Sequence, residues 1–437
     1  MKQRDPMSAD ITHAAAAAPT PTPTPSIIPA HIPAHLVRDV DLWEEISAAG
    51  IDAHARAAAL HDETPPIFYV PRLGYIGGAW VPRRAEDLRR ILQDTETFSN
   101  SGGTPFPQML GEAWRLIPLD IDPPDHAKYR ALLNPLFSPK RVDALEADIR
   151  AQATSLLNGF AANGRCDFNA EFAEQFPTLI FLRVMGWDTG EVTRFVEWTQ
   201  TIVKGMDIQA VIGAVKQVRD YLRARIAERR AAPGDDFTSS LLRAEVDAQL
   251  LTDDEVFGIC FLLFLAGLDT VTSSLGFQFM HLARNPAHQE ELRAHPERIP
   301  QAVDEMLRAY SIVNMRLTVT RDVTIGEATM KAGDFVLIST ELGNLDPEQF
   351  ASPATVDFNR ADAHVPHMAF AYGVHRCLGS HLARRELRIA LELWLKLPPF
   401  QLDADRTVRM RASGVFGLDN LHLVWAASGV AAPVACA

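Results

Sequence analysis

The sequence predicts a mainly α-helical protein with small β-sheets, an α+β fold arranged around one long central helix. Three observations predict it. Residues 253–284 carry an uninterrupted helical pattern whose middle is apolar nearly all round, as in a helix that crosses a domain core. Helical periodicity also marks residues 84–94, 140–160 and 208–222. The strand-like segments are short and are separated by Pro and Gly.

The N-terminal segment predicts no folded structure. Residues 1–35 are rich in Ala, Pro and Thr, and they lack the apolar stretch of a signal peptide or membrane anchor. We expect residues 1–35 to be a disordered tail and residues 36–430 to form a single domain. A length of 437 residues alone favours two or three domains, but this prior fails for folds built around a large buried cofactor.

The first half of the expected domain contains strands and then helices. Residues 67–70 and 75–81 predict short strands, and residues 99–119, rich in Gly and Pro, predict a loop. Asp122 predicts the N-cap of a helix that has Pro in its first turn. His126 and Arg130 are four residues apart on that helix and therefore share a face.

The central helix has clear ends. Thr252 and Glu255 form a capping-box pattern, and Asn285-Pro286 stops the helix after Arg284. A helix of this length spans roughly 48 Å at about 1.5 Å per residue. Its longest apolar run, 258–268, is too short to cross a bilayer.

The middle of this helix carries Ala266-Gly267-Leu268-Asp269-Thr270. Gly and Thr are poor helix formers, and a buried Asp is costly unless it is paired. A deformed turn here would open a groove and leave the Thr270 hydroxyl free to donate a hydrogen bond. The alternative is a simple helix kink with Asp269 paired to a distant Arg.

Charge and cysteine content exclude several classes of protein. The net charge of −13 argues against non-specific binding to nucleic acid or to an anionic membrane. The four cysteines lie far apart in the sequence, which argues against a structural zinc site and a disulfide framework. Such scatter is typical of a reducing cytosol, so we expect a soluble, cytoplasmic protein.

One cysteine occupies a position suited to metal ligation. Cys377 lies in the Gly-bounded loop Phe370 to Gly379, directly before a helical run that starts at Ser380. A helix N-terminus favours a thiolate and lowers the thiol pKa. An anionic sulfur in this position can be the axial ligand of a haem iron, where it favours O–O cleavage.

A charged pair precedes this loop by about 70 residues. Glu305 and Arg308 are three residues apart on a predicted helix and share one face. On composition alone, they form an ordinary surface ion pair worth roughly 0.2–0.5 kcal/mol.

Four segments occur in an order that resembles soluble bacterial cytochrome P-450s. They follow the patterns D-P-P-x-H-x-x-x-R, A-G-x-D-T, E-x-x-R and F-x-x-G-x-x-x-C-x-G, and the resemblance covers about residues 60–425. Within that family, segments 111–114, 264–270 and 381–386 resemble the camphor-hydroxylating branch. The resemblance implies a triangular helical prism, with haem b (iron protoporphyrin IX) buried between the central helix and the helix that follows the cysteine loop.

The resemblance also implies a role for each matching residue. Cys377 would bind the iron, and Thr270 would hold the bound oxygen and its water. Asp269 would link protons from solvent to the site, as a switch rather than a direct acid. Glu305 and Arg308 would meet Arg360 and brace the cysteine loop. The other residues implied around the haem are Phe370, Gly379, Ala266 and Gly267, with His126, Arg130, Arg316 and His375 at the propionates. The residues implied at the substrate are Trp114, Met109, Leu262, Leu265, Val313, Val415 and Phe416.

Three positions depart from the family pattern. Trp114 stands where the camphor enzymes carry a Tyr that binds the substrate ketone, so camphor itself is doubtful; the indole N–H could hold a carbonyl, or the ring could simply be packed in the loop. Ala371 replaces a frequent Gly, for which we expect a small effect. Asn314 replaces an Asp near the propionates.

The sequence therefore predicts a haem-thiolate monooxygenase that hydroxylates a small hydrophobic molecule of the terpenoid or norisoprenoid type with O₂. No G-x-G-x-x-G follows a strand, so electrons would come from a separate [2Fe–2S] ferredoxin and its reductase. That partner would dock near Arg130, Arg376 and Lys128, and residues 172–230 would form lid helices.

Two other classes stay open. The first is a haem-thiolate sensor or carrier, or a peroxygenase that needs no ferredoxin; the presence of Asp269-Thr270 argues against it. The second is a helical scaffold without cofactor, which would be colourless when purified.

Overall fold

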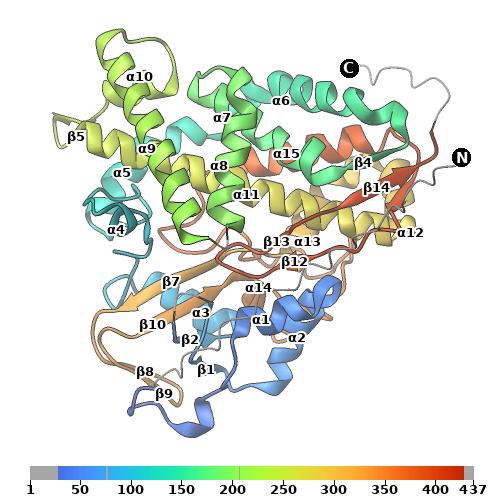
Figure 1. Ribbon diagram of the computed structural model, residues 1–437. Helices are drawn as coiled ribbons and strands as arrows, with labels where there is room; N and C mark the ends of the chain where they lie inside the picture. The colour runs from blue at the N-terminus through green and yellow to red at the C-terminus, as the bar shows by residue number, and fades with distance from the viewer. Residues whose placement is uncertain (1–27, 75–76, 206, 428–437) are drawn as a thin grey trace, which may run out of the picture.

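The central helix α11, Asp253–Arg284, crosses the helical layer of the molecule (Figure 1). The computed structural model describes residues 28–74, 77–205 and 207–427. The capping box is present: the Glu255 amide donates to Thr252 Oγ1 at 3.2 Å, and the Thr252 amide donates to Glu255 Oε2 at 2.7 Å. Both predicted ends of this helix are confirmed, because local caps determined them.

Helices form a layer around α11 and a smaller group beside the largest sheet (Figure 1). The helix α15, which follows the cysteine loop, contacts both α6 and α11. The remaining helices are α1 Leu42–Ala48, α2 Ala53–Glu63, α3 Ala85–Gln93, α4 Phe106–Leu110, α5 Asp125–Leu133, α6 Pro139–Phe160, α7 Gln175–Met185, α8 Val192–Lys204, α9 Ile208–Ala231, α10 Phe237–Leu242, α12 Pro286–Ala294, α13 Ile299–Ala309, α14 Thr340–Asn344 and α15 Ser380–Trp394.

The strands form small sheets, of which the largest has the order β1-β2-β10-β7-β3. Its strands are β1 Ile67–Val70, β2 Ala79–Pro82, β10 Phe335–Ser339, β7 Asn314–Val319 and β3 Phe98–Ser99. A three-stranded sheet has the order β11 Phe400–Leu402, β14 His422–Trp425 and β4 Arg165–Asp167. The two-stranded pairs are β12 Met410–Arg411 with β13 Gly417–Leu418, β5 Glu245–Val246 with β6 Gln249–Leu250, and β8 Val323–Ile325 with β9 Ala328–Met330. The predicted α+β class is therefore confirmed.

The predicted ends of helices and strands agree with the structure where the local sequence signals are strong. The strand 67–70 and the helices 84–94 and 140–160 match β1, α3 and α6 within one residue at each end. The strand expected over 75–81 begins only at Ala79, and residues 75–76 lie outside the described residues. The loop expected over 99–119 contains the short helix α4.

The predicted tail divides into two parts. Residues 1–27 lie outside the described residues, whereas residues 28–35 lie against the domain. Ile32 is buried, and His31 Nε2 lies 2.9 Å from Asp334 Oδ2. The Trp80 indole donates to the same carboxylate oxygen at 2.9 Å. A buried side chain and a side-chain hydrogen bond therefore help to hold the end of a segment whose composition alone favours disorder.

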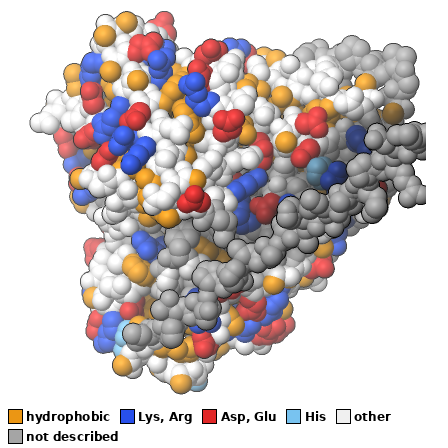
Figure 2. Space-filling view, in the orientation of Figure 1, with side chains coloured by type: hydrophobic (Ala, Val, Ile, Leu, Met, Phe, Trp, Pro, Cys, Tyr) orange, Lys and Arg blue, Asp and Glu red, His pale blue; other side chains and the backbone are white. Residues whose placement is uncertain are grey.

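Helix α11 meets the length and composition of a membrane span, because one 18-residue window has a mean hydropathy of 1.9. Within the protein, however, 61% of that window is buried, as in a core helix. On the face shown in Figure 2, basic and acidic side chains lie next to one another over the helical layer. Pairs such as Arg223–Asp254 and Arg225–Glu228, both at 2.9 Å, have this character.

Candidate active site around Cys377

The loop that carries Cys377 is folded back on itself. The Cys377 amide donates to the Phe370 carbonyl at 2.9 Å, and Gly379 then leads into α15. Gly373 has φ 72°, and a Cβ there would lie 2.5 Å from the Leu92 carbonyl oxygen. Glycine is therefore required at position 373 on both conformational and steric grounds. Ala371 also has a positive φ, 57°, which is costly for a residue with a side chain.

Cys377 is exposed to solvent. Enough protein atoms surround its sulfur, however, that desolvation affects the pKa of the thiol. Burial raises the pKa of its thiol, while the Gly379 amide and then the charges of Arg130 and Arg376 act in the opposite direction. The expectation of a lowered pKa is wrong for the protein alone, because desolvation outweighs the helix terminus. The opposing groups are nevertheless those that would stabilise a metal-bound thiolate.

Small residues expose the middle of α11. Ala266 and Gly267 are exposed although Phe264 and Leu268 on either side are buried. A Cβ added at Gly267 would meet no atom within 4 Å. Leu378 of the cysteine loop packs with the same apolar cluster as Phe264 and Leu268. The loop and the open part of the central helix therefore border the same region of the core.

Nitrogen donors of three segments gather beside the cysteine loop. The rings of His126 and His375 lie 4.1 Å apart, and burial lowers the pKa of each to about 4. Arg130 donates through Nη1 to the Arg376 carbonyl at 2.8 Å. Arg316 donates through Nη2 to the Gly102 carbonyl at 3.2 Å, and its guanidinium lies 4.3 Å from the Phe335 ring centre.

These residues fit a haem. Within the described part of the chain, His126 Nε2, His375 Nε2 and Arg316 Nε are buried polar atoms without a hydrogen-bond partner. Such atoms are costly unless a ligand satisfies them. They suit the two carboxylates of a porphyrin, while the exposed Cys377 suits its iron and the exposed Ala266-Gly267 its flat face.

The predicted deformation of α11 is absent. Helical structure runs without interruption through residues 253–284, and the Thr270 hydroxyl donates to the Ala266 carbonyl at 2.7 Å. The prediction of a free hydroxyl is therefore wrong for this state, because a Thr side chain in a helix readily bonds the carbonyl four residues earlier. The exposure that we attributed to a groove comes instead from the small side chains at 266 and 267.

Asp269 is buried, and its Oδ2 has no hydrogen-bond partner among the residues that the structure describes. Burial raises the pKa of its carboxyl to about 6, while the charges of Arg411 and Lys204 oppose the rise. Lys204 is itself paired with Glu174, at 3.0 Å between Nζ and Oε1. The distant Arg of the alternative interpretation thus exists, but it does not neutralise the carboxyl. Asp269 is positioned to change protonation near neutral pH.

Replacing Asp269 with Asn is expected to change how stability depends on pH. The folded pKa lies above the reference of 3.8, so the folded wild type binds more protons than the unfolded chain between about pH 4 and 6, and its stability falls as pH rises through this range. Between pH 4 and pH 7, the wild type should therefore lose up to about 3 kcal/mol of unfolding free energy through this group. Asp269→Asn should not show this loss. Denaturant unfolding at several pH values measures this, with the exposed Asp405→Asn as control. Parallel pH profiles for Asp269→Asn and wild type would contradict it.

The structure brings Glu305, Arg308 and Arg360 together in a buried cluster. Arg308 forms two 2.8 Å bonds to Glu305, and Arg360 Nε lies 3.1 Å from both Glu305 oxygens. Their exposed fractions are 7%, 2% and 8%, so the surface interpretation of the pair is wrong. The two arginines also donate to the carbonyls of Pro353 and Thr355, which lie in the chain leading to the cysteine loop.

The residues predicted at the substrate divide into two groups. Val313 and Val415 form an antiparallel β-bridge, and Met109, Leu262 and Leu265 are half-buried. Phe416, with 1% exposure, belongs to the main core, so its predicted place at the substrate is not supported. Its amide donates to the Ile312 carbonyl at 2.8 Å, and its side chain packs with the apolar core.

Trp114 is also packed rather than open. It is 6% exposed, and its indole donates to Glu112 Oε2 at 2.8 Å. The rings of Phe257 and Phe261 of α11 lie 4.9 and 4.8 Å from the Trp114 ring. Of the two interpretations, the structure therefore favours the packed one: a charged acceptor two residues away outcompetes a neutral carbonyl for the only indole donor.

Two charged residues near α5 have other roles than expected. The helix starts at Asp125, and the Asp122 carboxylate accepts from Ser99 Oγ and from the Asn100 amide instead of capping the helix. Because a proline disfavours helical geometry in the residue before it, Asp122 and Pro123 are biased away from the helix. Lys128 forms ion pairs with Asp125 and Asp247, so its charge is already partly neutralised.

Sequence reasoning missed Arg384 as a part of the site. Its guanidinium lies 4.4 Å from the Phe370 ring centre, and its Nε donates to Asp304 at 2.6 Å. It therefore ties α15 and α13 to the cysteine loop. The only sequence signal was its place in the segment 381–386, which does not indicate that Arg384 contacts Asp304 and Phe370.

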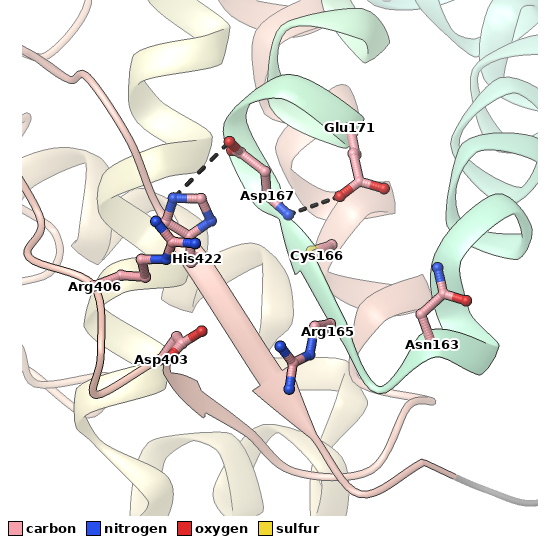
Figure 3. Close-up of a pocket in the computed structure, with 8 residues that line it drawn as sticks. All are labelled: Asn163, Arg165, Cys166, Asp167, Glu171, Asp403, Arg406 and His422. Atoms are coloured by element: carbon pink, nitrogen blue, oxygen red, sulfur yellow. Dashed lines mark hydrogen bonds and ion pairs between the residues drawn. The ribbon is translucent and has the colours of Figure 1, made fainter. Parts of the chain in front are cut away.

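A separate polar cavity lies on the three-stranded sheet (Figure 3). It has a volume of about 220 Å³, and His422 Nε2 lies 4.0 Å from Asp167 Oδ2 at its wall. Its lining residues are Asn163, Arg165, Cys166, Asp167, Glu171, Asp403, Arg406 and His422. None of them is a predicted site residue, so the cavity does not compete with Cys377 as the candidate centre.

Comparison with known proteins finds similar sequences and a similar solved structure. A family model described as cytochrome P450 matches residues 191–418. A relative from Sinorhizobium fredii, "Probable cytochrome P450 127A1", is 41% identical over 91% of this chain and 97% of its own. "Pentalenic acid synthase" from Streptomyces avermitilis is 32% identical over 79% and 88%. The solved structure of cytochrome P450 CYP101C1 has 32% identity and a TM-score of 0.82, covering 92% of this chain and all of that one.

Proposed function

The chain belongs to the cytochrome P450 family and is a haem-dependent monooxygenase, and from this premise we propose that it hydroxylates a small hydrophobic molecule of the terpenoid or norisoprenoid type. The proposed substrate class rests on the side chains of the residues that the resemblance places at the substrate. Met109, Leu262, Leu265 and the Val313–Val415 bridge offer no charged or hydrogen-bonding side chain. An apolar cavity over a large cofactor suits a small apolar ligand.

The segments that resemble the camphor-hydroxylating branch support a place near that branch. The 41% identity to "Probable cytochrome P450 127A1" shows that this chain is also similar to family members outside that branch. Camphor is not our proposed substrate, because the Trp114 donor is bound to Glu112. The scattered cysteines support a reducing compartment, so the proposed location is the cytoplasm.

The haem b of this family supplies oxygen activation when it is bound. In the proposed mechanism, the chain contributes four actions. Cys377 provides the anionic sulfur ligand, and the buried nitrogens of His126, His375 and Arg316 hold the propionates. Asp269 accepts protons from the solvent side and Thr270 passes them inward, which requires its hydroxyl to turn from the Ala266 carbonyl. The apolar lining orients the substrate and excludes water.

The reduced carbon monoxide complex tests this function. A thiolate-ligated haem shows a strongly red-shifted absorption band, whereas a scaffold protein would be colourless. Screening a terpenoid panel against the ferric spectrum then tests the substrate class. Spectral shifts confined to large or charged ligands would exclude a terpenoid substrate.

Thr270→Ala is expected to separate electron consumption from product formation. Without the hydroxyl, protons reach the site without the positioning that the reaction needs, so reducing equivalents should be lost as hydrogen peroxide. We expect product per electron pair to fall roughly 10²-fold or more, the range in which positioned proton transfer acts. The amounts of product formed, hydrogen peroxide released and electron donor consumed are measured in the same reaction. Thr270→Ser is the matched control. Unchanged coupling in Thr270→Ala would remove this residue from the mechanism.

We propose that a [2Fe–2S] ferredoxin delivers the electrons at the surface beside the cysteine loop. Arg376 is exposed there, and Val374 is an exposed hydrophobic residue at 44%. An apolar side chain with a neighbouring cation suits a small acidic partner protein.

Arg376→Glu is expected to slow electron transfer from an acidic ferredoxin by about tenfold or more at low salt, because charge steers association. The matched control is Arg406→Glu, since Arg406 is an exposed arginine at the separate polar cavity. Stopped-flow reduction at two salt concentrations measures both variants. Equal slowing in the two variants would mean that the loss reflects net charge and not docking beside Cys377.

A further inference from the structure

Glu112 is fully occupied by partners from two different segments. Its Oε2 accepts the Trp114 indole N–H at 2.8 Å, and its Oε1 accepts Arg219 Nη1 of α9 at 2.7 Å. Arg223, one helical turn further along α9, lies 3.9 Å from Oε2. A carboxylate held by cations on one side is a stable, oriented acceptor for the indole on the other.

The Trp114 ring is fixed from its faces as well. Phe257 and Phe261 contact it from α11, and the Arg223 guanidinium lies 4.6 Å from the centre of the Phe257 ring. Arg223 also pairs with Asp254 at 2.9 Å. The loop, the lid helix α9 and the start of α11 thus hold one indole in one orientation.

An indole has a single N–H, and here a carboxylate accepts it. Trp114 can therefore offer a ligand only its ring surface. The other residues predicted at the substrate are Met109, Leu262, Leu265, Val313 and Val415, and none has a donor group in its side chain.

We propose that Glu112 is a specificity-determining residue: by binding the Trp114 indole N–H, it withholds that donor from ligands and selects hydrocarbon-like ligands over matched ketones. This rests on the proposed function, because it concerns the cavity of that same site. Arg219 is the positioning residue that keeps Glu112 on the indole.

The test compares two ligands of nearly equal shape in the ferric holoenzyme: a bicyclic monoterpene ketone and its parent hydrocarbon. Each competes with a phenylimidazole that coordinates the haem, and the ratio of the two affinities is the readout. In the wild type, the ratio should lie within twofold of one. In Glu112→Ala the indole is released, and the ratio should shift about fivefold towards the ketone, the factor that one neutral hydrogen bond gives.

Two further variants separate this effect from general loosening. Glu112→Ala combined with Trp114→Phe should return to the wild-type ratio, because the donor is gone. Asp220→Ala is the matched control, since Asp220 is the other ion-pair partner of Arg219 at 2.7 Å and does not touch the indole. Arg219 keeps one of its two partners in each single variant.

A readout that needs no ligand completes the test. In ¹⁵N-tryptophan-labelled protein, the indole signal that disappears in Trp114→Phe should move upfield in Glu112→Ala and stay in place in Asp220→Ala. An unmoved signal, an unchanged ligand ratio in Glu112→Ala, or a wild type that already favours the ketone would overturn the proposal. If neither ligand competes, the ligand class is wrong, whereas a missing thiolate band would overturn the proposed function.

Discussion

Replacing Cys377 with serine is expected to abolish both the red-shifted band of the reduced carbon monoxide complex and substrate oxidation. Serine is nearly isosteric, so the loop should keep the bond from the residue 377 amide to the Phe370 carbonyl. Its hydroxyl, however, does not ionise near neutral pH and cannot supply the electron density that favours O–O cleavage. Oxidation should fall to the background of free haem.

Two other cysteines provide matched controls. Cys166 and Cys260 are buried and free, and burial raises the pKa of the Cys260 thiol to about 12. The corresponding serine variants should keep the band at full intensity per haem, even where they lose some stability. A Cys377→Ser protein with the wild-type band and turnover would show that another residue binds the iron.

Arg360→Met is expected to cause a large loss of stability, because it breaks the buried cluster of Glu305, Arg308 and Arg360. Among the described residues, it leaves Glu305, which is 7% exposed, with Arg308 as its one cationic partner. It also removes the Arg360 donor from the Ala351 carbonyl and one of the two arginine donors from the Thr355 carbonyl, which Arg308 still holds. Breaking a buried pair of this kind costs about 3–5 kcal/mol, a large part of the roughly 5–15 kcal/mol that keeps a domain folded.

Denaturant unfolding and the rate of haem transfer to apomyoglobin measure the two consequences. We expect faster haem loss as well as lower stability, because the cluster holds the chain that leads to Cys377. The matched control is Arg298→Met, whose partner Glu291 lies 2.7 Å away in a partly exposed pair. Such pairs contribute about 0–1 kcal/mol. Equal losses in both variants would contradict a special role for the buried cluster.

The backbone of the site was predictable because its signals are local. The capping box and the Asn285-Pro286 stop each act within one helical turn, and the apolar middle lies between them, so α11 could be placed to the residue. The cysteine loop was recognisable because it depends on spacing within ten residues. The Glu305 cluster followed only from the family resemblance, since nothing in an E-x-x-R pattern distinguishes a buried pair from a surface one.

What could not be predicted depends on partners that are distant in sequence. Asp122 looks like a helix cap, but its acceptors are used by the loop at Ser99 and Asn100. Trp114 looks like a substrate donor until Arg219, more than one hundred residues later, is seen to hold Glu112 beside it. Periodicity and local propensity carry no information about either contact.

The conformation of Ala371 has a consequence for how the metal-ligand loop is made. With φ at 57°, this residue adopts a backbone geometry that costs an L-amino acid roughly 1–2 kcal/mol, so our expectation that alanine matters little underestimated it. The loop does not inherit its curvature from local preference at this point. Contacts with neighbouring parts of the fold impose that curvature. The position of the Cys377 sulfur therefore depends on the tertiary structure more than on the ten residues of the loop motif.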